Sequence, residues 1–286
     1  MTDSHARSLW RLLEPIHAVT YFSAEPLAAL RGAGFKGFWM GYFAGRAAPF
    51  GAVGPELVRA TFYNFSAERV HAALPDAWSN GSPEAALAAR ESGSVAAVAR
   101  MLGIDVSGDG PVRAAELARL AATSAPLEGR PLYAANAALP WPTEPLAALW
   151  HAATLLREHR GDGHVVALQA AGISGRESHV LRSLVAGIPR PTYTVARDFT
   201  DEEWALRTSS LAERGLVDGT GLTALGAETA DAIESMTDAL AAPAYDVLGE
   251  DGVAELIALL EPITAAVAAS GDIPAAAPME LRLDRR

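Results

Sequence analysis

Apolar and polar residues recur at helical spacing where the pattern along the chain is clearest. In WHAATLLREHRGDGHVVAL, residues 150–168, positions 151, 155 and 159 return to one face of a helix. Alanine is abundant and runs of Val, Ile and Thr are scarce, which favours helices over strands. Towards the C-terminus the pattern predicts two long helices, at about 225–242 and 251–269. We therefore predict a mainly α fold.

Glycines interrupt this pattern within the same segment. Because glycine is unfavourable inside helices, Gly161 and Gly163 are predicted to end the helix that starts near His151. Asp162 is then predicted to cap a second helix, with His164 in its first turn.

Two stretches of the chain repeat in the same order. HAVTYF, residues 17–22, returns as HAATLL at 151–156, a separation of 134 positions. NFSAERV, residues 64–70, returns as DFTDEEW at 198–204 with the same separation. From these ordered matches we infer an internal duplication.

A third match supports the duplication, and a proline-rich stretch indicates its boundary. LAALRGAGFKG at 27–37 parallels VVALQAAGISG at 165–175 if four residues are inserted. The stretch RPLYAANAALPWPTEP, residues 130–145, is typical of a linker. The predicted units are therefore residues 1–135 and 136–286.

The second unit contains signals for a helix, a hairpin and a further helix. Thr200 with Glu203 three residues later predicts a capping box, and a helix is predicted to end at Gly215. A short hairpin-like stretch follows, and a long helix begins after Thr223. LAERGLVDG and LTALGAE, within residues 211–228, resemble the end of the recognition helix, the wing and the next helix of MarR-type winged-helix regulators. The whole chain is similar to an actinobacterial family in which two such units are fused.

This resemblance implies two tandem MarR-like winged-helix units with small β-hairpin wings. The first unit is the degenerate one, because it lacks a clear wing after Trp78. The resemblance also implies a DNA-binding transcription regulator. It further implies that the shared helices meet near a pseudo-twofold axis, as in a MarR dimer, beside a cleft of the kind in which MarR-like proteins bind small aromatic acids.

Composition and charge narrow the classes of function. Of the 286 residues, 50% are hydrophobic and 20% charged, as in soluble globular proteins. The net charge of −11 makes a general attraction to nucleic acid or anionic lipid unfavourable. The absence of cysteine excludes disulfides, thiolate catalysis and thiolate–metal sites. No signal-type core and no apolar run of about 18 residues is present, so we expect a cytoplasmic protein without a membrane partner.

The predicted reading helix of the second unit has the wrong charge for DNA. Its first turn carries three consecutive carboxylates, at positions 201–203, which would face the phosphates. The corresponding residues 66–71 of the first unit are only weakly basic. The same acids would also complement a helix N-terminus without any role in function. We expect DNA binding to be largely lost, while DNA-binding regulation stays open as an alternative.

Histidine, arginine and acidic residues gather between positions 151 and 164. Three of the seven histidines lie there, with two arginines and two acids. Three interpretations stay open: an ordinary polar turn with surface ion pairs, a metal site, or a ligand site in which Arg157 or Arg160 holds an anion. The spacing matches no common metal motif, so neither a metal nor a cofactor is predicted. If the protein is an enzyme, the candidate general bases are His151, His159 and His164.

Arg46 is the one charge in an aromatic segment, FWMGYFAGRAAPFG at 38–51. An arginine stays protonated and is costly to bury unpaired. It either reaches solvent, pairs with a buried acid, or faces a central cavity and binds an anionic group there. We favour the cavity, with Trp39, Tyr42 and Tyr63 as its walls.

The leading hypothesis is a protein that binds a small anionic or aromatic molecule in the cleft between the two units. The alternatives are a MarR-like DNA-binding regulator and an enzyme that uses histidine and arginine residues of the same cleft. The oligomeric state stays open. The candidate ligand-binding residues are His17, Trp39, Tyr42, Arg46, Tyr63, Asn64, His151, Arg157, His159 and His164.

Overall fold

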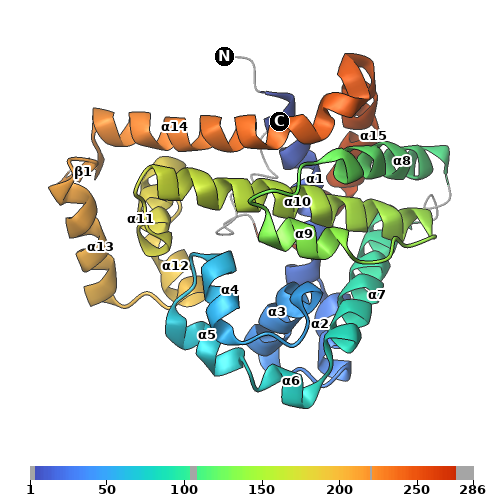
Figure 1. The fold of residues 1–286 in the computed structure, drawn as a ribbon, viewed down its shortest axis with the longest axis horizontal. Helices are drawn as coiled ribbons and strands as arrows, with labels where there is room; N and C mark the ends of the chain where they lie inside the picture. The colour runs from blue at the N-terminus through green and yellow to red at the C-terminus, as the bar shows by residue number, and fades with distance from the viewer. Residues whose placement is uncertain (1–3, 104–107, 220, 275–286) are drawn as a thin grey trace.

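The computed structural model describes residues 4–103, 108–219 and 221–274, and most of them are helical, as predicted (Figure 1). Short loops, many with a glycine in the left-handed region, join the elements. In chain order the elements are α1 (His5–Phe22), α2 (Ala24–Gly32), α3 (Gly37–Ala47), η1 (Ala48–Phe50), α4 (Pro55–Phe62), α5 (Ala67–Ala73), α6 (Ala77–Asn80), α7 (Pro83–Leu102), α8 (Asp109–Ser124), α9 (Pro131–Ala137), α10 (Pro145–Ala170), α11 (Gly175–Ala186), α12 (Arg190–Arg197), α13 (Asp201–Glu213), β1 (Val217–Asp218), β2 (Gly221–Leu222), α14 (Ala224–Ala241), η3 (Ala242–Leu248) and α15 (Gly249–Ala269).

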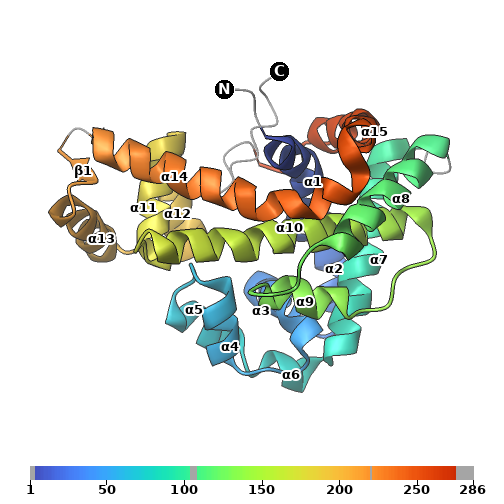
Figure 2. The same ribbon diagram turned by 45° about the horizontal axis from the view of Figure 1, so that its top comes forward.

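Helix α10 runs through the middle of the molecule, with α14 along one side and α2 to α6 on the other (Figures 1 and 2). Proline at its first position suits a helix start, because its missing N–H would have no partner there. Leu149, Trp150 and Leu155 on α10 are at most 1% exposed. They belong to a core that also contains residues of α1, α7, α8 and α15, so both predicted units contribute to one core.

The predicted break of α10 at its two glycines is wrong. The helix continues without interruption from Pro145 to Ala170, so His164 lies inside it and not in a first turn. The guanidinium of Arg130 packs against Gly163, and a Cβ at position 163 would lie 3.3 Å from Arg130 Nη1. Asp162 does cap a helix, but that helix is α9, whose first N–H groups donate to its Oδ2 at 2.9 Å. Burial of α10 on several sides outweighs the helix propensity of two glycines.

The two helices that carry the repeated sequence pack against each other. His17 Nδ1 on α1 lies 2.9 Å from Thr154 Oγ1 on α10, and Trp150 Nε1 donates to Thr20 Oγ1 at 3.2 Å. The rings of His17 and Trp150 are stacked, with centroids 6.2 Å apart. The predicted meeting of these helices is therefore present.

Helices α11 to α14 and the hairpin β1–β2 make up the segment for which a winged helix was predicted. The strands pair antiparallel with Val217 opposite Leu222, so the predicted hairpin is present. The predicted capping box at Thr200 is only half formed: its hydroxyl accepts from the Glu203 N–H, while the Glu203 carboxylate accepts from Arg176. This hairpin makes up the one sheet found among the described residues.

The bounds of the two C-terminal helices, α14 and α15, agree closely with the prediction.

Judged by length and composition alone, the stretch Ala224–Ala269 is apolar enough to cross a membrane, with a mean hydropathy of 1.7 in its most apolar window. In α15 the buried residues lie at helical spacing on one face, for example Val253, Leu256 and Leu260, and they pack into the shared core. A core helix passes the same test, so this stretch is weak evidence for a membrane span.

Candidate functional site

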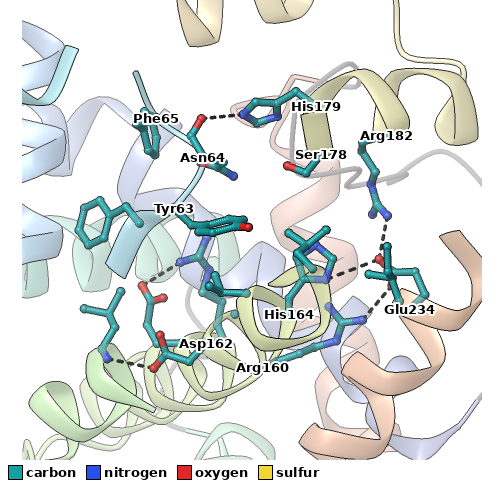
Figure 3. A pocket seen from close by; sticks show the side chains of 18 of the residues that line it. Tyr63, Asn64, Phe65, Arg160, Asp162, His164, Ser178, His179, Arg182 and Glu234 are labelled. Carbon is teal, nitrogen blue, oxygen red and sulfur yellow. Dashed lines mark hydrogen bonds and ion pairs between the residues drawn. The ribbon is translucent and has the colours of Figure 1, made fainter. Parts of the chain in front are cut away.

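A cavity of about 240 Å³ lies where α10, α11 and α14 face the corner between α4 and α5 (Figure 3). Tyr63, Asn64 and Phe65 reach it from that corner, while His164 and Glu234 reach it from α10 and α14. Charged side chains are prominent in its wall. They are Glu14, Arg46, Arg157, Glu158, Arg160, Asp162, Arg182, Arg197, Asp231 and Glu234.

Arg46 lines this cavity and also pairs with a buried acid. Its Nη2 donates to both carboxylate oxygens of Glu158, at 3.2 and 3.1 Å, and its Nη1 donates to the Tyr42 hydroxyl at 3.1 Å. The guanidinium also lies over the ring of Phe62, 4.2 Å from its centroid. The side chains of Arg46 and Glu158 are 12% and 5% exposed. Pairing with a buried acid, one of the three open interpretations of Arg46, is therefore the one the structure shows.

Glu158 belongs to a chain of four alternating charges. Arg157 Nη1 donates to it at 2.8 Å, and Arg157 Nε donates to Glu14 at 3.2 Å. Burial alone would raise the pKa of Glu158, but Arg157 and Arg46 outweigh it and hold this pKa at about 2. Two guanidinium groups therefore balance two carboxylates in this part of the wall.

A second charged cluster centres on Glu234 of α14. Its carboxylate pairs with Arg160 at 3.2 Å, with Arg182 at 2.9 Å and with Arg7 at 2.6 Å. Burial would raise the pKa of Glu234, yet the cationic neighbours led by Arg182 hold it at about 2. Because Arg7 comes from α1, Arg160 from α10 and Arg182 from α11, this cluster ties these three helices to α14 at one end of the cavity.

The three histidines of the α10 cluster do not meet. His151 packs edge-on against Trp141, with ring centroids 4.8 Å apart, and His159 packs edge-on against Tyr133, at 5.1 Å. Eight residues on a helix separate these two histidines by about 12 Å along its axis. Only His164 lines the cavity, and its Nδ1 lies 3.0 Å from Thr237 Oγ1. No group of residues suited to a metal ion exists within the described part of the chain.

All three histidines are neutral near pH 7. Burial, the largest cause, lowers the pKa of His151, His159 and His164 to about 4 in each case. The pKa of Asp162 moves in the opposite direction. Burial raises this pKa to about 7, although two backbone N–H groups donate to the carboxylate.

Six of the ten predicted ligand residues line the cavity: Tyr42, Arg46, Tyr63, Asn64, Arg157 and His164. The other four lie elsewhere. His17 is buried between α1 and α10, His151 and His159 pack in the core, and Trp39 lies against Phe65 beneath Arg69.

The corner at residues 63–65 is held tightly against the start of α11. The Tyr63 hydroxyl donates to the Ile173 carbonyl at 2.6 Å, and His179 Nε2 lies 3.1 Å from the Asn64 carbonyl oxygen. Because a carbonyl only accepts, His179 Nε2 carries the proton. Gly175 makes this close approach possible, since a Cβ there would lie 2.0 Å from the backbone carbonyl oxygen of Tyr63. The backbone of this corner and the side chain of Tyr63 are therefore held in place at the cavity wall.

Sequence reasoning missed Arg197, the last residue of α12, which also lines the cavity. Its guanidinium lies over Phe65, 4.6 Å from the ring centroid, and its Nη1 donates to the Ala196 carbonyl at 2.9 Å. Its Nε is buried without a hydrogen-bond partner among the described residues. The repeat did contain a signal, because Arg197 stands 134 positions after Tyr63, a residue that was singled out.

The predicted DNA-reading helix, α13, places acids at its exposed start. Asp201 pairs with Arg190, and Glu203 pairs with Arg176 at 2.7 Å, while Glu202 stays exposed. Ion pairing therefore neutralises two of the three carboxylates without creating a basic surface.

The order α11–α12–α13, followed by the hairpin and α14, is the order expected of a helix-turn-helix protein. Residues 6–274 match the model of a helix-turn-helix family, and the chain therefore belongs to this family. No functionally curated protein and no solved structure matches the chain significantly. The MarR-type likeness, the actinobacterial source and the duplication are finer than this match and stay predictions.

Proposed function

We propose that the protein binds a small anionic or aromatic molecule in the cavity beside α10. The observation that carries this proposal is a partly open cavity of about 240 Å³ whose wall holds buried charged side chains from both halves of the chain. Buried ion pairs are weak contributors to stability, because desolvation offsets most of their attraction. Charged side chains gathered around a cavity are therefore better explained by a bound polar molecule than by folding alone.

The proposal includes two MarR-like units, residues 1–135 and 136–286, that arose by duplication. Thr20 and Thr154 are separated by the same 134 positions as the two histidines of the repeat, and both contact the opposite helix. Ser66 and Thr200, again 134 positions apart, each accept from the N–H three residues later at the start of a helix. Helices α3, α4 and α5 thus correspond in order to α11, α12 and α13.

Ligand binding can be tested with two matched valine substitutions. Val185 lines the cavity and is 42% exposed, whereas Val166 on α10 does not line it and is 40% exposed. Tryptophan at position 185 should fill the entrance and weaken binding at least about tenfold, while Val166→Trp should leave it unchanged. Binding would be measured by mass spectrometry of co-purified compounds and by thermal shift with metabolite mixtures. Equal binding by both variants would reject the cavity as the site.

A DNA-binding regulator is the second candidate, and membership of the helix-turn-helix family favours it. A regulator should bind DNA selectively at low salt through α13, and a charge change there should alter binding. Glu202→Lys, at the exposed start of α13, should then strengthen binding if the acids oppose it. A gel-shift experiment with genomic fragments at 50 mM salt measures this, and sequence-selective wild-type binding would establish the regulator.

A further inference from the structure

We propose that Arg197 receives the anionic group of the ligand, so that the cavity selects a carboxylate over the corresponding neutral amide. This inference rests on the proposed ligand binding in the cavity. It assigns the anion to Arg197 and not to Arg46, whose charge is already matched by Glu158.

The neighbouring charges leave Arg197 without a carboxylate. Arg46 and Arg157 are balanced by Glu158 and Glu14. Asp198, the next residue, pairs with Arg69, and the carboxylate beside Arg176 is Glu203. No ion pair is found for Arg197 among the described residues, although it lines the cavity.

The titratable groups that act most strongly on Arg197 from the surrounding helices include no carboxylate. They are Tyr42 and Arg46 on α3, Arg176 and the neutral His179 on α11, and Tyr193 on α12. An arginine in this environment is poorly compensated, since a ring face and one carbonyl replace little of its hydration. An anion in the cavity would supply the missing partner and the acceptor for its Nε.

The aromatic rings that pack against the two arginines indicate where this anion would lie. Arg46 stacks on Phe62 and Arg197 stacks on Phe65, and the two rings lie 6.5 Å apart on the same corner. Contacts of Tyr63 with the loop before α11 and of Asn64 with α11 hold that corner in place. A planar carboxylate can accept two parallel N–H groups from a guanidinium, whereas an amide can accept only with its single oxygen and carries no charge.

Matched acid and amide pairs test this assignment. The pairs are acetate and acetamide, benzoate and benzamide, and 1-naphthoate and 1-naphthamide, with binding measured by calorimetry or ligand-observed NMR. For the pair that fits, the wild type should prefer the acid by about 10- to 100-fold, the value of a charge-assisted hydrogen bond. Arg197→Met should reduce this preference to about threefold or less, and Arg197→Lys should restore part of it.

Arg119→Met is the control, because Arg119 also stacks on an aromatic ring, that of Trp141 at 4.7 Å, but lies outside the cavity. It should keep the wild-type preference. The melting temperature of Arg197→Met should stay within about 3 °C of the wild type, because no buried acid loses its partner.

The other possible results would contradict either the role of Arg197 or the proposed ligand binding. If amides bind the wild type as well as acids do, or if Arg197→Met keeps the preference, the assignment of Arg197 is wrong while ligand binding stands. If Arg197→Met melts far below the wild type, Arg197 has a structural role and the assignment is again wrong. If no acid and no amide binds at millimolar concentration, the proposed ligand binding fails together with the inference.

Discussion

Replacing Arg46 by methionine removes one member of the buried charge chain and leaves an acid behind. In the wild type, Arg46 and Arg157 together balance Glu158 and Glu14. In Arg46→Met, the single cation Arg157 serves two carboxylates that are each at most 4% exposed as residues. The variant therefore contains one uncompensated buried negative charge.

The expected loss of stability follows from this imbalance. Removing one partner of a buried ion pair typically costs about 3–5 kcal/mol. Because Arg157 stays 2.8 Å from Glu158, we expect a value near the lower end, about 3 kcal/mol. For a large single chain, each 1 kcal/mol corresponds to roughly 2–4 °C, so the melting temperature should fall by about 6–12 °C.

A double-mutant cycle isolates the cause of this loss. Glu158→Leu should also destabilise, because it leaves two cations for Glu14 alone. The double variant Arg46→Met/Glu158→Leu keeps the balanced pair of Arg157 and Glu14, and it should recover most of the stability. Calorimetric or denaturant unfolding measures all four proteins. A melting temperature of Arg46→Met within about 2 °C of the wild type would refute the reasoning.

Further predictions concern pH and two glycines. Because the pKa of Glu158 is held at about 2, below the roughly 4.3 of an unfolded glutamate, its stabilisation is full above pH about 4.3 and is lost as the pH falls towards 2. Unfolding measured from pH 6 to 2.5 should therefore show a shallower acid slope in Arg46→Met than in the wild type, and equal slopes would contradict the pairing. Gly175→Ala places a Cβ 2.0 Å from the backbone carbonyl oxygen of Tyr63 and should destabilise the protein by about 2 kcal/mol or more. Gly161→Ala, whose Cβ has only an ordinary contact at 3.7 Å inside α10, should stabilise by up to about 1 kcal/mol, and chemical unfolding of both variants checks the opposite signs.

Several features of the fold were predictable because they depend on neighbouring residues. Helical spacing and the rarity of β-branched runs predicted a mainly α chain, and the C-terminal helices were placed within two residues of their observed bounds at both ends. The hairpin between α13 and α14 followed from glycine-rich turn residues. In each case the signal and the structure it predicts lie within a few residues of each other.

Other features depended on contacts between distant parts of the chain. The sequence by itself indicated that Arg46 needs a partner, because an unpaired buried guanidinium is costly, but the partner is Glu158, 112 residues away. It also indicated helix breaks at Gly161 and Gly163, which packing around α10 overrides. Arg197 lies in the cavity wall only because the fold brings its guanidinium over the ring of Phe65. Local sequence determines which segments become helices, whereas tertiary packing decides which charges share a buried space, because burial removes the solvent that would otherwise make their positions unimportant.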